Sequence, residues 1–106
     1  MKRSPHDGVP EKRSAIAHLI LVIHFPGTGS LKEKRRLLSG LLAKIRDRYP
    51  VSCAETGYQD LWQRTLVEVV MVSQDSSAPE RVFEKILDLV RSNPALDLLD
   101  SLKESL

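Results

Sequence analysis

The sequence of 106 residues has one cysteine, five aromatic residues and no apolar run long enough to cross a membrane. Because Cys53 is alone, an internal disulfide is excluded and a reducing, cytoplasmic setting is favoured. The longest apolar run, residues 19–23, has the length of a strand, whereas a membrane helix needs about 18 residues. The few aromatic residues argue against an RNA-recognition motif, whose sheet presents several stacking rings.

The remaining composition is typical of one small globular domain. Hydrophobic residues make up 42% of the chain and charged residues 28%, and a chain of this length buries a core without disulfides. Residues 1–14 are polar, contain two prolines and have no apolar segment behind their charges. We therefore expect a disordered N-terminal tail rather than a signal peptide, followed by a single domain at residues 15–106.

Hydrophobic periodicity predicts four strands and two helices. The strands are expected at residues 15–25, 51–56, 65–73 and 96–104. One helix should run from Ser30 to about Arg48, and the other from Ser77 to about Asn93. Each serine stands three residues before a glutamate, which predicts a capping box at both helix starts.

The element order is β-α-β-β-α-β, which is the split β-α-β arrangement of ferredoxin-like folds. The predicted class is therefore α+β, a sandwich of one antiparallel sheet with two helices on one face. The other face would expose an apolar patch, which is typical of an interface and predicts a homodimer. The patch consists of Ile20, Val22, Leu66, Val70 and Val72.

Positive charge is concentrated on the first predicted helix. Residues 31–48 hold seven Lys or Arg against two Asp or Glu, whereas residues 49–76 hold one against four. Clustered cations on a helix can neutralise successive phosphates, so this pattern predicts nucleic-acid contacts. The alternative is a solvated face whose long side-chain stems cover the edges of the core. The predicted contacts are Lys32, Lys34, Arg35, Arg36 and Arg46.

The only tryptophan, Trp62, is followed by Gln63 and Arg64. An indole beside amide and guanidinium donors can stack an unpaired base while its neighbours bind the base edge. The alternative is a tryptophan that caps the sheet or a dimer seam. The hairpin at residues 57–63 is long enough to fold back, so we expect Trp62 nearer to residues 32–36 than to Arg46.

Metal and catalytic chemistry find little support in the sequence. His18 and His24 share a strand face but lie about 20 Å apart at 3.3 Å per residue, too far to share a metal ion. Cys53 has no partner at ligand spacing, which favours a buried thiol. Residues 27–32 lack the glycine directly before the lysine of a nucleotide-binding loop. We expect no enzyme, metal or cofactor; a deep pocket holding His24 with a carboxylate would favour an enzyme instead.

Four motifs in a fixed order resemble the YlxP-like bacterial family, the domain of unknown function 503. They are Leu-Lys-Glu-Lys-Arg-Arg at residues 31–36 after a Pro-Gly turn, Asp-Leu-Trp-Gln-Arg at 60–64, Val-Ser at 72–73 and Ser-Asn-Pro at 92–94. The similarity runs from about Ile16 to the end, although Thr65 stands where the family commonly has a small apolar residue. The resemblance implies a ferredoxin-like fold and a gene often found among translation and ribosome-maturation genes.

The prediction is a small non-enzymatic binding protein that is associated with RNA or the ribosome. Its expected partner is ribosomal RNA or the ribosome itself, and no membrane or DNA partner is expected. The alternative is a homodimeric protein-protein interaction module that uses the open sheet face and has no role with nucleic acid.

Overall fold

The structure is a computed structural model that describes residues 8, 9 and 14–106. All six predicted elements are present, with ends within about two residues of those expected. Most of the predicted tail, residues 1–14, lies outside the described residues. The elements are β1 (Ala15–His24), α1 (Leu31–Arg48), β2 (Ser52–Gly57), β3 (Arg64–Ser73), α2 (Ala78–Arg91) and β4 (Asp97–Ser105).

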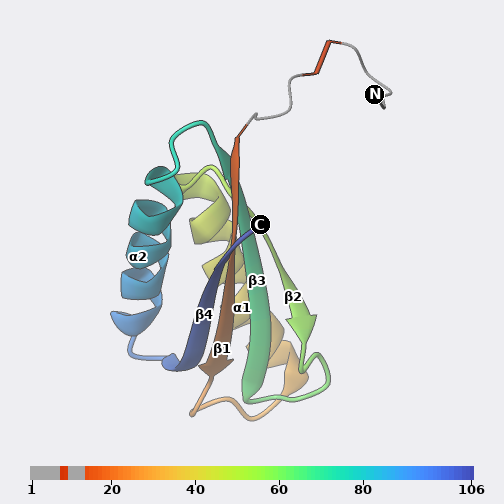
Figure 1. Ribbon diagram of the computed structural model, residues 1–106. Coiled ribbons are helices and arrows are strands. Elements are labelled where there is room, and N and C mark those ends of the chain that lie inside the picture. The colour runs from red at the N-terminus through yellow and green to blue at the C-terminus, as the bar shows by residue number, and fades with distance from the viewer. Residues whose placement is uncertain (1–7, 10–13) are drawn as a thin grey trace.

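The four strands form one antiparallel sheet in the order β2-β3-β1-β4. β1 and β3 are central and pair over their full length, from Ala15 opposite Ser73 to His24 opposite Arg64. Figure 1 shows both helices on the same side of this sheet. The ferredoxin-like fold predicted from the element order is therefore confirmed.

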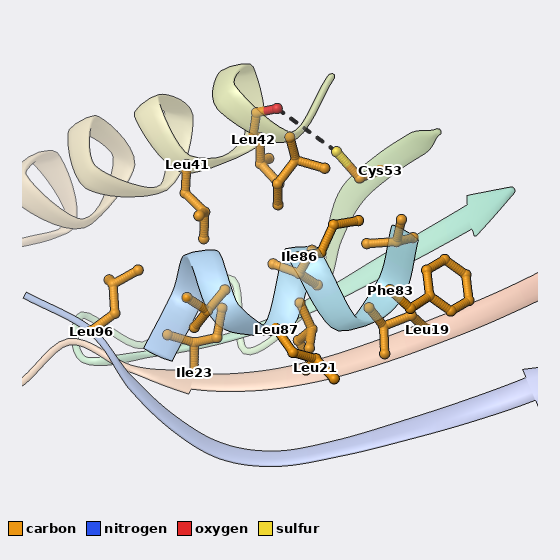
Figure 2. Close-up of a cluster of buried hydrophobic side chains, with 14 of the residues drawn as sticks. Leu19, Leu21, Ile23, Leu41, Leu42, Cys53, Phe83, Ile86, Leu87 and Leu96 are labelled. Carbon is orange, nitrogen blue, oxygen red and sulfur yellow. Dashed lines mark hydrogen bonds between the residues drawn. The ribbon is translucent and has the colours of Figure 1, made fainter. Parts of the chain in front are cut away.

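The core lies between the helices and the sheet. Alternate residues of β1 point into it, because successive strand side chains face opposite ways, and Leu19, Leu21 and Ile23 are completely buried. They meet buried side chains of α1 and α2 (Figure 2). Each such side chain contributes about 1.5–3 kcal/mol through its burial. Packing of this core positions the ends of the strands, and the loops that join those ends form the candidate site.

Cys53 is a buried thiol, as predicted. It is 6% exposed, and its Sγ lies 3.9 Å from the carbonyl oxygen of Leu42 (Figure 2). Burial raises the pKa of this thiol, and the guanidinium of Arg46 only partly opposes the rise. The protonated form is therefore favoured, so Cys53 packs as a small apolar side chain.

The capping box at Ser30 is present in a modified form. The Oγ of Ser30 accepts a hydrogen bond from the backbone N–H of Glu33 at 3.1 Å, as the motif predicts. The carboxylate of Glu33, however, accepts from the N–H of Gly29 at 2.8 Å. The reciprocal hydrogen bond of Glu33 is therefore made with the residue before the N-cap, and the two bonds hold the turn that leads into α1.

The capping box predicted at Ser77 is wrong. Ser77 has helical dihedral angles, φ −89° and ψ −17°, and its side chain makes no capping bond. Its N–H and its hydroxyl both donate to one carboxylate oxygen of Asp75 at 2.8 Å. These bonds lower the pKa of Asp75. The hydroxyl of Ser77 donates to the carboxylate of Asp75 instead of accepting a capping bond, because a hydrogen bond to a charged group is stronger than a bond between neutral groups.

Candidate nucleic-acid interface

Two loops meet at one end of the sheet: the β1–α1 turn at residues 25–30 and the β2–β3 hairpin loop at residues 58–63 (Figure 1). The N–H of Phe25 donates to the carbonyl of Gln63 at 2.9 Å. The side-chain amide of Gln63 donates to the carbonyl of Thr28, also at 2.9 Å. The hairpin is therefore held against the turn from which α1 begins.

Trp62 lies in this hairpin, so its loop is at the end of the sheet where α1 starts, as the topology predicted. Arg46 lies near the other end. Its Nη2 donates to the carbonyl of Cys53 at 2.6 Å, and Cys53 is the second residue of β2, before that strand runs toward the hairpin. Arg46 is thus separated from the other predicted contacts and already holds a backbone partner.

Lys34 is the clearest correction to the predicted site. It is 1% exposed, and its ammonium lies 2.8 Å from a carboxylate oxygen of Glu55. It also donates to the carbonyl of Tyr58 at 2.7 Å. The prediction that Lys34 contacts a phosphate is wrong, because this face of α1 packs toward β2 and its charge is already neutralised inside the protein.

The same buried network shapes the hairpin. Glu55 also accepts a 2.7 Å bond from the hydroxyl of Thr65, which is fully buried. Tyr58 has a φ of 57°, a left-handed conformation that is uncommon for a residue with a side chain. Lys34 binds the carbonyl of that residue, so its role is to hold the hairpin in position.

Gly57 is required by close packing at the end of β2. A Cβ atom there would lie 2.9 Å from Cδ2 of Leu66, which is closer than van der Waals contact. The backbone of the hairpin therefore lies directly against the side chain of β3.

The remaining predicted contacts are exposed at this end of the molecule. We call Lys32, Arg35, Arg36, Trp62 and Arg64 the loop-end surface. Trp62 is 53% exposed, which is unusual for the only tryptophan of a small domain. The guanidinium of Arg64 lies 5.7 Å from the ring centre of Tyr58, close enough for a cation–π contact.

A hollow of about 450 Å³ lies beside Trp62. We call it the Trp62 hollow; it is lined by His24, Asp60, Leu61, Trp62, Gln63 and Arg64. His24 and Arg64 are register partners at the ends of their strands, so the hollow lies where the sheet meets the loops. Nδ1 of His24 lies 3.4 Å from a carboxylate oxygen of Asp97.

The nucleic-acid site predicted from the sequence did not include Tyr58, Asp60 or Leu61. Asp60 and Leu61 directly precede Trp62 in the same long loop. Their position in the sequence therefore indicated that they would lie beside it. Tyr58 could not have been found, because its ring is placed by a left-handed backbone that no sequence motif indicated.

His18 and His24 pair with separate carboxylates. Nε2 of His18 lies 2.7 Å from Glu68, while His24 contacts Asp97. Within residues 8, 9 and 14–106, His, Cys, Asp and Glu form no group of three that could hold a metal ion. The Trp62 hollow brings His24 together with Asp60, but the six residues that line it include no serine, threonine or cysteine nucleophile.

The face of the sheet opposite the helices, here the open sheet face, carries the predicted apolar patch. Val70 and Val72 are 36% and 62% exposed, and the other three predicted residues are half-buried. Ile16 and Leu102 are exposed beside them. Leu102 stands opposite Ile20 in the β1–β4 register. Leu102 was not predicted from the sequence, because a bulge in the β1–β4 pairing interrupts the regular alternation of side chains between the two faces.

Comparison with known proteins supplies the family. Residues 16–103 match the family model described as "Protein of unknown function (DUF503)". The chain belongs to the DUF503 family. It is also similar to "Uncharacterized protein YlxP" of Bacillus subtilis (strain 168), with 38% identity over 69 residues that cover 65% of this chain and 75% of that protein. The predicted resemblance to the YlxP-like family is confirmed.

The part of this DUF503 chain matched by the family model includes both sides of the loop-end surface, the start of α1 and the hairpin. In the described part of the chain, neither helix has the length and apolar character needed to span a bilayer.

Proposed function

We propose that this DUF503 protein is a non-enzymatic RNA-binding module that acts in translation or ribosome maturation. One observation carries the proposal: an exposed tryptophan and four exposed cations, three of them on α1 and one at the start of β3, lie at one end of the sheet. The gene association implied by the family resemblance supports the cellular setting. Ribosomal RNA, free or in the ribosome, is the expected partner in the cytoplasm.

The charges of the loop-end surface suit a phosphate backbone. Lys32, Arg35 and Arg36 occupy the first turns of α1 and are exposed. Arginine also binds phosphate with two parallel hydrogen bonds, which lysine cannot do.

The position of Trp62 favours single-stranded RNA over a duplex. Bases of a single strand are free to stack on an aromatic side chain, whereas those of a duplex are already stacked. The Trp62 hollow, with Arg64 in its wall, lies at the sheet side of the loop end, and the three cations of α1 lie at the helix side. A flexible strand can cross from one to the other.

The experiment is a titration with short single-stranded RNA at several salt concentrations. Affinity should fall as salt rises, because bound phosphates release counterions. Arg35→Glu should weaken binding and reduce the salt slope by about 0.7 for each lost phosphate contact. Lys85→Glu on α2 is the matched control and should change little. Absent binding, or binding that does not depend on salt, would refute the proposal.

The open sheet face supports a second candidate function, a homodimeric interaction module. Its apolar side chains surround His18 and Glu68, which lie 2.7 Å apart. In a two-fold dimer His18 of one copy can pair with Glu68 of the other, and Glu68 with His18. The open sheet face therefore fits a second copy of this chain. The solution mass at low concentration tests the candidate. A monomer that persists at high concentration would refute it.

A further inference from the structure

We infer that the Trp62 hollow binds an unpaired guanine base. The inference rests on the proposed RNA-binding function and names the base that its site would select. It is carried by the chemistry of three lining residues: the carboxylate of Asp60, the indole of Trp62 and the guanidinium of Arg64.

The size and the surface of the hollow suit a planar ring. Its volume of about 450 Å³ is within the range of roughly 300–1,000 Å³ that is usual for small-molecule sites. Trp62 is 53% exposed and Leu61 47%, so their apolar surfaces are available for contact. Stacking on an indole holds any base, because every base has a π face.

Asp60 supplies the selection among bases. A carboxylate only accepts hydrogen bonds, and it has two oxygens side by side. On its pairing edge guanine presents two adjacent donors, at N1 and N2, which match those oxygens. None of adenine, cytosine and uracil presents two adjacent donors on that edge, so one oxygen of the carboxylate would face an acceptor.

Arg64 fits a different edge of the same base. An arginine fork binds O6 and N7 of guanine with two hydrogen bonds, a common specific contact of proteins with nucleic acids. The guanidinium lies 5.7 Å from the ring centre of Tyr58, which restricts its position. Adenine would offer a donor where guanine has O6, so both charged residues of the hollow disfavour it.

The remaining lining residues are already held in place. Gln63 donates its amide to Thr28 at 2.9 Å, and His24 contacts Asp97 at 3.4 Å. The bond of Gln63 holds its side of the hollow in position before a ligand arrives, which reduces the entropy lost on binding.

Fluorescence of the intact protein tests the inference, because Trp62 is the only tryptophan. GMP, AMP, CMP and UMP are titrated separately at equal ionic strength, followed by the RNA pentamers UUGUU and UUAUU. GMP and UUGUU should bind about tenfold or more tightly than their adenine counterparts. Equal binding of all four nucleotides would overturn the inference.

Two variants identify the selecting groups. Asp60→Asn should remove most of the guanine preference, even if the lost negative charge strengthens binding of every nucleotide. Arg64→Lys keeps the positive charge and should also reduce the ratio of GMP to AMP affinity. Asp88→Asn on α2 is the control and should leave that ratio unchanged. An unchanged ratio in both hollow variants would overturn the inference.

The pentamers separate this inference from the proposed function. Salt-dependent binding of both pentamers with equal affinity would overturn the guanine site and leave RNA binding intact. Selective binding of GMP without salt-dependent binding of either pentamer would support the hollow as a nucleotide site and refute the RNA-binding function.

Discussion

The side-chain amide of Gln63 donates a 2.9 Å hydrogen bond to the carbonyl oxygen of Thr28, 35 residues away in the sequence. The bond joins the hairpin that carries Trp62 to the turn that begins α1. Two motifs that are separate in the sequence therefore lie at the same end of the sheet. The proposed RNA-binding function requires this contact between the loops, because neither motif alone supplies both an aromatic ring and the cations of α1.

Replacing Lys34 by methionine should destabilise the protein by about 2–4 kcal/mol, because it leaves the largely buried Glu55 without its cation. Denaturation by urea measures the change. Lys44→Met, at an exposed position on the same helix, should cost less than about 0.5 kcal/mol. Adding Glu55→Gln to the Lys34 variant should recover part of the loss. Equal effects of the two lysine variants would contradict a structural role for Lys34.

The two serines that resemble helix caps should differ in their effect on stability. Ser30→Ala removes a hydrogen bond to the N–H of Glu33 and should cost about 1 kcal/mol. Ser77→Ala removes only exposed side-chain contacts with Asp75 and Arg81, so it should cost less than about 0.5 kcal/mol. Thermal unfolding of both variants in parallel makes the comparison. A larger loss at Ser77 would contradict the assignment of the caps.

Trp62→Ala should weaken RNA binding by about 1–3 kcal/mol, the usual contribution of one stacked base. The stability of the fold should change little, because the indole is 53% exposed. Anisotropy of a labelled RNA measures the affinity. Trp62→Phe should retain most of the affinity, and Leu99→Ala, an exposed apolar position on β4, should retain all of it. Unchanged affinity in the alanine variant would exclude stacking at this residue.

Acid should destabilise the protein partly through Glu68. A hydrogen bond from the hydroxyl of Thr56, with a further contribution from His18, lowers the pKa of Glu68 below its ordinary value of 4.5. The folded state then binds fewer protons than the unfolded chain in mild acid. The stabilisation is complete above the ordinary pKa and is lost as the pH falls through the folded-state pKa.

Unfolding experiments at a series of pH values measure this contribution. The free energy of unfolding should fall less steeply with acid in Glu68→Gln than in the unmodified protein. Asp47→Asn, an exposed change on α1, serves as the control and should keep the original slope. An identical slope for Glu68→Gln would show that this carboxyl has the same pKa in both states.

The order of the elements and the core were predictable, because strand alternation and helical spacing record which side chains are buried. The burial of the Lys34 side chain was not predictable. Its charge predicted exposure, but Glu55 and the carbonyl of Tyr58 give the ammonium partners from other elements. The Trp62 hollow likewise depends on strand register, which brings His24 opposite Arg64. Such contacts between distant residues leave no periodic signal in the chain.

The most direct test of the single-surface account is backbone amide NMR of the nitrogen-labelled protein during titration with single-stranded RNA. The account predicts that chemical-shift changes concentrate at the start of α1, residues 31–36, and in the hairpin, residues 58–64. Changes centred on Val70 and Val72 of the open sheet face, or on the Arg46 end of α1, would contradict it.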